Sequence, residues 1–311
     1  MKRFTNFLLI LFFAVYSSVF TPLMAQDNSD KINVSSISEQ KKAVQVANPS
    51  LPLTLPLREG SIRFMAVGDT GRGNKEQNEL AQVMFRYRQV FPFEFVILMG
   101  DNIYYQKSAE DMKTKFENVY RPLLDAGVKF YATLGNHDES NQRFYEYFNM
   151  NGEEYFRFSK GGVSFYSLNS NYMDKRQIDW IKEKLSGDTA KWQIAFFHHP
   201  PYSSGKRHGS DDDVREIVEP LLINSGVDAV FTGHEHFYER IKPQNGIYYF
   251  ITGAGGKIRK GNIKKNSPLT ATAYDTDLSF MLIELVDDEM YFQVISRSGL
   301  TVDSGVIKRR N

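Results

Sequence analysis

Short apolar runs that end in polar clusters recur through this 311-residue chain, and they restrict its fold more than any other feature. Six of the runs have the length and the β-branched or aromatic content of buried strands. They span residues 62–67, 95–99, 129–133, 163–168, 193–197 and 229–232. Amphipathic helical patterns lie between several of them, at 75–89, 109–125, 175–185 and 211–224. Strands that alternate with helices predict an α/β layered domain.

The C-terminal part of the chain has a different pattern. Residues 247–252, 280–286 and 290–296 have the character of strands, and only turns or a loop separate them. We therefore expect a more antiparallel sheet to close the domain. The sequence contains no internal repeat and no second linker, so residues 61–311 are predicted to form one catalytic domain.

The N-terminus has the character of an export signal. Lys2 and Arg3 precede an apolar run over residues 7–20, and Ala25 stands just before a polar stretch. This order predicts a secretory signal peptide over residues 1–25. The run is shorter than the roughly 20 residues that a membrane-spanning helix needs, although an uncleaved anchor is the alternative. Residues 26–60 are rich in polar residues and proline, which predicts a disordered linker.

Composition excludes several classes of function. The chain has no cysteine, so it can form no disulfide, no thiolate metal site and no cysteine nucleophile. Its formal net charge of +1, without a basic stripe, gives no indication of a nucleic-acid partner. The sequence is typical of a secreted or periplasmic bacterial protein that does not insert stably in a membrane once its signal is removed. Its oligomeric state is left open.

Polar clusters directly follow five of the predicted strands. They are Gly68-Asp69-Thr70-Gly71, Gly100-Asp101-Asn102-Ile103-Tyr104, Gly135-Asn136-His137-Asp138, His198-His199-Pro200-Pro201-Tyr202 and Gly233-His234-Glu235-His236. Ligands of open α/β sheets bind at the carboxyl ends of the strands, so we expect the clusters to form one site. All six histidines of the chain lie in these clusters or, for His208, shortly after one.

The side chains in these clusters are those that bind metal ions. Histidine, aspartate, asparagine and tyrosine are suitable ligands for zinc, iron and manganese. A single catalytic metal needs only about three or four protein ligands, and these clusters offer more. Two metals roughly 3.5–4 Å apart, bridged by a carboxylate, would use the whole set.

In their order and content the five clusters resemble the calcineurin-like metallophosphoesterase superfamily, and most closely its purple acid phosphatase family. Most of the superfamily has Asp-x-His in the first cluster, whereas here Thr70 and Gly71 follow Asp69. Tyr104, three residues after Asp101, stands where purple acid phosphatases use a tyrosine ligand. The resemblance covers residues from about 61 to 260. It implies a four-layer α/β sandwich of two mixed sheets flanked by helices.

The resemblance also implies a ligand set for two metal ions. A ferric ion would be held by Asp69, Tyr104 and His236. A second ion, which is iron, zinc or manganese in the family, would be held by Asn136, His198 and His234. Asp101 would bridge the two ions.

Three histidines remain outside this ligand set. His198 rather than His199 is the expected ligand, because the family pattern is His-x-Pro and Pro200 has that spacing. His199 is then either a partner of the ligands or a packed residue. By resemblance His137 contacts the substrate phosphate, and Asp138 could orient its ring.

His208 resembles the general acid that protonates the leaving oxygen, and the alternative is a solvated loop histidine. For Lys206 and Arg207 in the same loop, contact with phosphate and a solvated loop face are both open. Residues 253–257 contain several glycines but lack the nucleotide-binding pattern, so we predict a turn on the rim of the site. Glu235 is expected to point away from the ligands that flank it.

Together the clusters and the resemblance predict a secreted hydrolase of small phosphate monoesters that uses a metal-activated hydroxide. The alternatives on the same scaffold are a phosphodiesterase, a nucleotidase or a pyrophosphatase, because the ligand motifs do not set specificity. A non-catalytic metal-binding surface protein is the alternative from another class.

Overall fold

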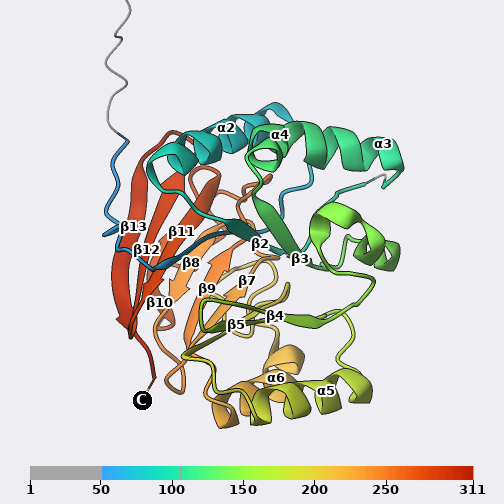
Figure 1. Ribbon diagram of the computed structural model, residues 1–311, viewed down its shortest axis with the longest axis vertical. Coiled ribbons are helices and arrows are strands. Elements are labelled where there is room, and N and C mark those ends of the chain that lie inside the picture. Colours follow the sequence, from blue (N-terminus) through green and yellow to red (C-terminus); the bar gives the residue numbers. More distant parts are fainter. Residues whose placement is uncertain (1–50, 106, 311) are drawn as a thin grey trace, which may run out of the picture. The chain divides into compact units, whose positions relative to one another are not determined.

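Two β-sheets pack face to face in the computed structural model, which describes residues 51–105 and 107–310 (Figure 1). Each sheet carries helices on its outer face, and the layers run helix, sheet, sheet, helix. This arrangement confirms the predicted four-layer α/β sandwich of two mixed sheets.

The first sheet joins the N-terminal and C-terminal parts of the described chain. Its strand order is β13-β12-β11-β1-β2-β3. The strands are β1 (Ile62–Val67), β2 (Phe95–Met99), β3 (Lys129–Thr133), β11 (Ser279–Val286), β12 (Glu289–Ser296) and β13 (Thr301–Lys308). Strands β1, β2 and β3 run parallel to one another. Strands β11, β12 and β13 form an antiparallel meander, which pairs with β1 through β11.

The second sheet has seven strands in the order β10-β8-β9-β7-β6-β5-β4. They are β4 (Phe156–Lys160), β5 (Val163–Ser167), β6 (Trp192–Phe196), β7 (Ala229–Thr232), β8 (Tyr238–Ile241), β9 (Tyr248–Thr252) and β10 (Thr270–Tyr274). Strands β5, β6, β7 and β9 lie at the centre of this sheet and run parallel to one another. Strand β4 pairs antiparallel with β5, β8 with β9, and β10 with β8.

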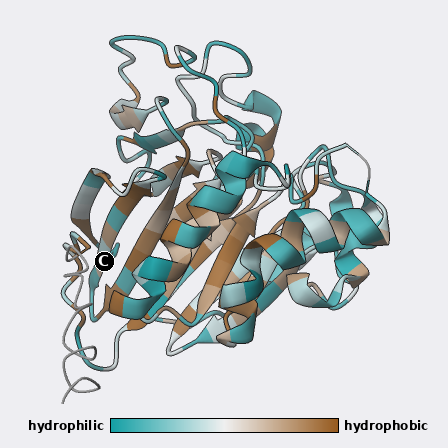
Figure 2. Ribbon diagram, turned by 90° about the horizontal axis from the view of Figure 1, so that it is seen from above, coloured by the Kyte–Doolittle hydropathy of each residue, from teal (hydrophilic) through white to brown (hydrophobic). Residues whose placement is uncertain are grey.

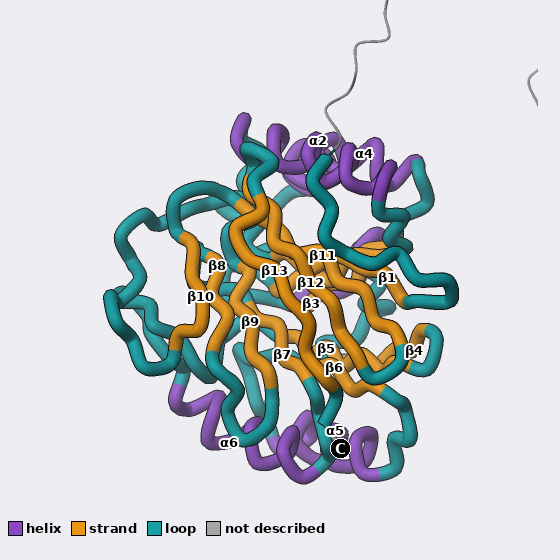
Figure 3. The backbone as a smooth tube through the Cα atoms, turned by 90° about the vertical axis from the view of Figure 1, so that its left-hand side faces the viewer, coloured by secondary structure: helices purple, strands orange, loops and turns teal. Residues whose placement is uncertain are grey.

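Helices cover the outer faces of both sheets (Figures 1 and 3). The first sheet carries α2 (Lys75–Val90), α3 (Ala109–Met112), a π-helical segment (Lys113–Glu117) and α4 (Asn118–Asp125). The second carries α5 (Lys175–Ser186) and α6 (Asp212–Asn224), and two short 3-10 helices follow β3 at Ser140–Phe144 and Glu146–Phe148. None of the helices in the described residues is both long enough and apolar enough to cross a bilayer.

Three apolar layers hold the four structural layers together. One lies between the first sheet and α2 and α4, one between the two sheets, and one between the second sheet and α5 and α6. Figure 2 shows the result: the strands are hydrophobic, and the helices turn hydrophilic faces outward. Phe64 on β1 lies at the centre of the middle layer, where its ring stacks on Phe95 and meets the edges of Phe165 and Phe231.

The six predicted strands and four predicted helices all form, with ends that differ by at most one residue. The predicted helix 109–125 contains a π-helical turn, a feature that often marks a functional site. Strands β4, β8, β10 and β13 were not predicted from the sequence. They lie at or near sheet edges, and most of their residues are at least partly exposed in β4, β10 and β13, so their apolar signal is weak.

The expectation that a more antiparallel sheet closes the domain is wrong in part. Residues 247–252 form β9, which lies parallel to β7 in the second sheet. The β11–β12 hairpin does pair antiparallel, but it extends the first sheet on β1 instead of closing the domain by itself.

The predicted disordered linker 26–60 extends too far. Residues 51–58 lie against the first sheet: Leu57 and Arg58 donate their backbone N–H groups to the buried carboxylate of Glu284, at 2.9 and 2.6 Å. Thr54 N–H bonds to Gln293 Oε1 at 2.8 Å. Partners on strands far along the sequence order this segment, and local composition does not reveal them. The predicted signal peptide 1–25 and residues 26–50 lie outside the described residues.

We predict that Phe64→Ala lowers the free energy of unfolding by about 3–5 kcal/mol, because it opens a cavity between the sheets. Urea denaturation at equal metal content measures the change. The matched control is Phe144→Ala, whose ring is 67% exposed and whose loss should change stability by less than about 1 kcal/mol. Equal losses for the two variants would contradict the central role of Phe64.

Candidate metal centre

The carboxyl ends of five strands meet at one edge of the sandwich. Each end delivers one of the predicted residues: Asp69 after β1, Asp101 after β2, Asn136 after β3, His198 after β6 and His234 after β7. Asp69, Asp101 and His234 have φ angles of 56°, 52° and 67°. Non-glycine residues in this left-handed region cost about 1–3 kcal/mol each and cluster at functional sites. The backbone is thus strained at three of the predicted ligands.

Three of the predicted ligands form a tight triad in the interior. The Tyr104 hydroxyl lies 3.0 Å from Asp69 Oδ1 and 3.1 Å from His236 Nε2. Asp69 Oδ1 and His236 Nε2 are themselves 3.2 Å apart. All three side chains are almost completely buried. The structure therefore brings together the residues predicted to hold the first metal.

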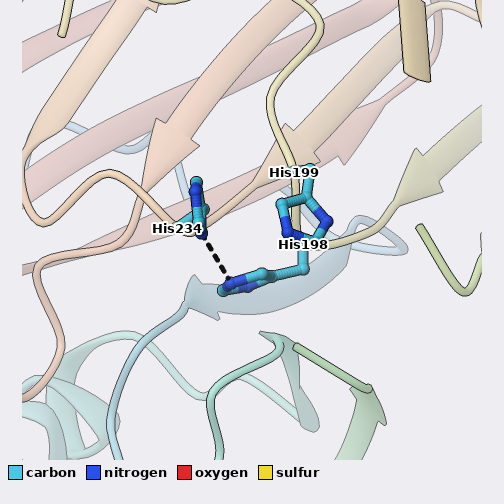
Figure 4. A group of neighbouring side chains, drawn as sticks. All are labelled: His198, His199 and His234. Atoms are coloured by element: carbon cyan, nitrogen blue, oxygen red, sulfur yellow. Dashed lines mark hydrogen bonds between the residues drawn. The ribbon is translucent and has the colours of Figure 1, made fainter. Parts of the chain in front are cut away.

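A second triad lies beside the first and is more open to solvent. His198 Nε2 is 3.0 Å from Asn136 Oδ1, and His234 Nδ1 is 3.1 Å from the same oxygen. The two histidine nitrogens are also 3.1 Å apart, as the dashed line in Figure 4 marks. These are the three residues predicted to hold the second metal.

Asp101 contacts both triads. Its Oδ1 lies 3.5 Å from His198 Nε2 in the second triad. One of its carboxylate oxygens also lies within 4.8 Å of the ligand atoms of Asp69 and His236 in the first. The backbone N–H of His137 donates to Oδ1 at 2.9 Å and fixes the carboxylate. This position between the triads is the one that a bridging carboxylate needs.

Hydrogen bonds outside the triads set the state of the histidine ligands. His198 donates from Nδ1 to the carbonyl oxygen of Met99 at 2.7 Å, which leaves a lone pair on Nε2 facing the triad. Burial, followed by the charge of Arg259, lowers the pKa of His236 to about 2. Burial, followed by His198, also lowers the pKa of His234. Both rings are therefore neutral and able to bind a metal ion.

Both acidic groups of the first triad have raised pKa values. Burial, followed by the charge of Asp101, raises the pKa of Asp69 well above its ordinary value. Burial and the charge of Asp69 do the same to the pKa of the Tyr104 hydroxyl. A cation in the triad would reverse both shifts by favouring the ionised forms.

The separations within the triads fit metal ions. Two ligand atoms bound at right angles to one ion, at about 2.1 Å each, lie about 3.0 Å apart. Five of the six separations in the two triads are 3.0 or 3.1 Å, and the sixth is 3.2 Å. A shared cation would also stabilise the two buried carboxylates, Asp69 and Asp101, which lie in one cluster with His236. The residues present fit a pair of metal ions.

His199 lies next to the second triad but outside it. Its ring centre is 4.6 Å from that of His234, and its Nδ1 is 2.9 Å from Ser170 Oγ (Figure 4). Burial, followed by the charge of His198, lowers its pKa to about 3. His199 is therefore neutral, and one of its ring nitrogens lies within 4.8 Å of the ligand nitrogens of His198 and His234. The choice of His198 over His199 as the ligand stays a prediction.

His137 is exposed at the edge of the first triad, with its ring centre 5.1 Å from that of Tyr104. The expectation that Asp138 orients this ring is wrong. The Asp138 carboxylate instead accepts backbone N–H groups of Asn102, Ile103 and Gly135. Asp138 thus ties the loop after β2 to the loop after β3 and so holds Asp101 in place.

His208 reaches the site from the loop after β6, and its ring centre lies 4.3 Å from that of His234. Sequence reasoning missed what holds this loop. The buried carboxylate of Glu235 accepts the backbone N–H of Gly209 at 2.9 Å, the N–H of His208 at 3.3 Å and Asn262 Nδ2 at 2.8 Å. Glu235 does point away from the ligands, as expected. Its position between two predicted ligands was not enough to predict that it holds the His208 loop.

Residues 253–257, predicted to form a turn on the rim of the site, pack against the loop of Asp69, and residues 253–256 are buried. A Cβ atom on Gly256 would meet the carbonyl oxygen of Thr70 at 2.4 Å, so only glycine lets this turn approach the loop of Asp69. Lys115, in the π-helical turn, was not predicted either. Its Nζ donates to the carbonyl oxygen of Tyr104 at 2.8 Å and helps to hold that ligand loop.

Comparison with known proteins identifies relatives of this arrangement. The family model described as calcineurin-like phosphoesterase matches residues 62–238. Purple acid phosphatase 17 of Arabidopsis thaliana is 26% identical over 244 residues, which cover 66% of this chain and 71% of that protein.

Two solved structures share the fold. GAP50 of Plasmodium, described as the anchor in the inner membrane complex, superposes with a TM-score of 0.71 at 20% identity, over 81% of this chain and 90% of that one. Purple acid phosphatase PPD1 from yellow lupin (Lupinus luteus) superposes with a TM-score of 0.70 at 17% identity, over 80% of this chain and 54% of that one. The chain therefore belongs to the calcineurin-like phosphoesterase family, in its purple acid phosphatase branch, and is a metal-dependent hydrolase of phosphoric esters.

Proposed function

We propose that the protein is an exported phosphatase that hydrolyses small phosphate monoesters at a centre of two metal ions. The observation that carries the proposal is the pair of donor triads joined by Asp101, with His208 at the open side of the second triad. A metal pair in such a site supplies a water molecule of lowered pKa as the nucleophile and screens the charge of the phosphoryl oxygens.

In this proposal the two sites hold different ions. Asp69, Tyr104 and His236 would hold ferric iron, because a phenolate and a carboxylate are hard, anionic ligands. Asn136, His198 and His234 would hold iron, zinc or manganese, because their donors are neutral. Asp101 belongs to both sets.

The two remaining histidines act on the substrate. His137, exposed beside Tyr104, is placed to donate a hydrogen bond to a phosphoryl oxygen. His208 is placed to give a proton to the leaving oxygen, which is needed when the leaving group is a poor one. Burial, followed by the charges of Arg259 and Arg207, lowers the pKa of His208 below its ordinary value of 6.5. The acid form of His208 is therefore present mainly at acidic pH.

The non-catalytic alternative receives less support from the site. All seven predicted ligands are present, and their donor atoms converge, whereas a protein that only anchors or binds a partner has no need of them. We propose export on the evidence of Lys2, Arg3 and the apolar run over residues 7–20. Fractionation of the source cells and N-terminal sequencing of the mature protein would test it.

Replacement of the shared carboxylate tests the proposed function itself. We expect Asp101→Asn to lower turnover of 4-nitrophenyl phosphate by more than about 100-fold, since even groups that only orient metal ligands are worth about 10–100-fold. Far-ultraviolet circular dichroism should be unchanged. A matched control is Asp179→Asn on α5, at an exposed position. A metal-loaded wild-type protein that hydrolyses no phosphate ester would support the non-catalytic alternative.

The tyrosine ligand should be visible in the absorption spectrum. A ferric phenolate gives the family its purple colour, so the iron-loaded protein should absorb in the visible range and Tyr104→Phe should not. Tyr105→Phe, which changes the neighbouring exposed ring, is the control and should keep the band. A band that survives in Tyr104→Phe at full iron content would assign iron to other ligands.

The leaving group should reveal the role of His208. We expect His208→Gln to slow hydrolysis of an alkyl phosphate by about 10²–10⁴-fold and that of 4-nitrophenyl phosphate far less. In the wild type, the rate with the alkyl phosphate should fall as the pH rises through the pKa of His208, because the proton to be donated is lost. That fall should be absent in the variant. Equal slowing of both substrates would contradict the general-acid assignment.

A further inference from the structure

The loop that carries His208 has a buried base and an exposed tip. Residues 203–205, at the start of the loop, are buried, whereas Lys206, Arg207 and His208 are exposed. The ring nitrogens of His208 form no hydrogen bond with any of the described residues, and the ring centre lies 4.3 Å from that of His234. The position of the His208 ring therefore depends on how the backbone of the loop is anchored.

Two buried carboxylates hold the start and the end of this loop. At its end, Glu235 accepts the backbone N–H groups of His208 and Gly209. At its start, Glu239 on β8 accepts the backbone N–H of Ser204 at 2.9 Å. Both glutamates have an exposed fraction of 0%. The loop is thus attached at both ends to the same short segment of the chain.

The Glu239 carboxylate has a second partner that fixes its orientation. The hydroxyl of Thr270, at the start of β10, donates to its other oxygen, Oε1. The pairing of β10 with β8 shifts register between Thr270 and Thr272, which indicates a β-bulge. Bulges often occur next to active sites, where they change the direction of a side chain. Here the bulge occurs at the threonine that holds the Glu239 carboxylate.

The start of the loop is also bonded to a second loop. Lys264 N–H donates to the carbonyl oxygen of Ser204 at 2.9 Å. Ser204 is therefore held through both groups of its backbone, by Lys264 at the carbonyl oxygen and by Glu239 at the N–H. Its neighbour Gly205 passes so close to Glu235 that a Cβ atom would lie 1.9 Å from Oε1. Because the packing is this tight, a displacement of Ser204 would displace the residues that follow it.

Burial of Glu239 is unfavourable for the stability of the fold alone. No basic side chain in the described part of the chain forms an ion pair with its carboxylate, and the neighbouring Arg240 is paired with Asp303 instead. A buried carboxylate without an ion pair is costly unless hydrogen bonds compensate for the lost water. One of the two hydrogen bonds that Glu239 accepts comes from the His208 loop. Its contribution therefore lies in where it holds the backbone of that loop.

We propose that Glu239 is a positioning residue for His208, and that its bond to Ser204 sets the direction in which the His208 ring faces the leaving oxygen. The inference rests on the proposed phosphatase function and adds a residue that acts through the general acid without touching the substrate. A misplacement of about 1 Å at a reacting group can slow a reaction about 100-fold. A nitrophenolate leaves without being protonated, so hydrolysis of its ester does not depend on this position.

Replacement of Glu239 tests the inference through the leaving group. In Glu239→Ala, turnover of an alkyl phosphate should fall about 10-fold or more relative to turnover of 4-nitrophenyl phosphate. Glu239→Gln keeps an oxygen for Ser204 N–H and supplies an amide group that can donate to the Thr270 hydroxyl. It should therefore keep the ratio of the two turnover rates within about 3-fold of the wild-type ratio.

The matched control is Glu284→Ala. The Glu284 carboxylate is equally buried and also accepts two backbone N–H groups, those of Leu57 and Arg58. It stands opposite Arg63 near the start of β1, whereas the metal centre lies at the carboxyl end of that strand. Its loss should lower the free energy of unfolding and leave the ratio of the two turnover rates within about 2-fold.

A double variant shows whether Glu239 acts through His208. In a His208→Gln background, Glu239→Ala should slow hydrolysis of the alkyl phosphate by less than about 2-fold more, because the group that Glu239 positions is already gone. If the effects of the two substitutions instead multiply in full, Glu239 acts independently of His208 and the inference is wrong.

Hydrogen exchange separates this inference from the proposed function, because it requires no turnover. In metal-loaded Glu239→Ala, the amides of residues 203–209 should exchange about 10-fold or more faster than in the wild type, and Glu239→Gln should keep their protection. A wild-type protein without turnover on either substrate would count against the phosphatase. The exchange rates would still show whether Glu239 holds the loop.

Two further results would overturn the inference. One is equal slowing of both substrates in Glu239→Ala, which would reduce its role to general stability. The other is unchanged exchange of residues 203–209 in that variant, which would mean that the other contacts of the loop hold it without Glu239.

Discussion

The crowding of donor atoms at the strand ends is the constraint on which the rest of the structure depends. Asp69 and Asp101 are buried within one cluster, and they share it with two neutral histidine rings and the Tyr104 hydroxyl. Three of the predicted ligands also have left-handed backbone conformations. Such an arrangement persists only if contacts with the surrounding structure hold it in place. Backbone N–H groups fix both carboxylates here: His234 donates to Asp69, and His137 donates to Asp101.

The sandwich meets this constraint by joining the two sheets at the site. Each sheet contributes ligands from the ends of its parallel strands, and the Phe64 cluster between the sheets fixes how far apart those ends lie. The connection continues at the rim, where Gly68 N–H of the first sheet donates to Thr252 of the second at 2.9 Å. The metal centre is therefore a property of the interface between the sheets, and neither sheet could form it alone.

The sequence predicts the central strands, and the residues that meet at their carboxyl ends, because both depend on local patterns. A buried parallel strand is a continuous apolar run, and its polar C-terminal cluster follows directly. Other features depend on partners distant in sequence. Strands β4 and β13 lie at sheet edges with alternating or weak apolar character, and residues 51–58 are ordered by Glu284 and Gln293. The roles of Glu235, Asp138 and Lys115 likewise appear only when distant loops meet.

The buried acids link metal binding to the stability of the fold. The pKa of Asp69 is raised in the folded chain, so without metal this group favours the folded state below its unfolded pKa, near 3.8. That contribution is lost as the pH rises through the folded value, and above that value the ionised acid opposes folding. A cation bound by Asp69 and Asp101 reverses the sign, because it favours the ionised carboxylates. The same metals that the reaction requires thus remove the electrostatic cost of building their site.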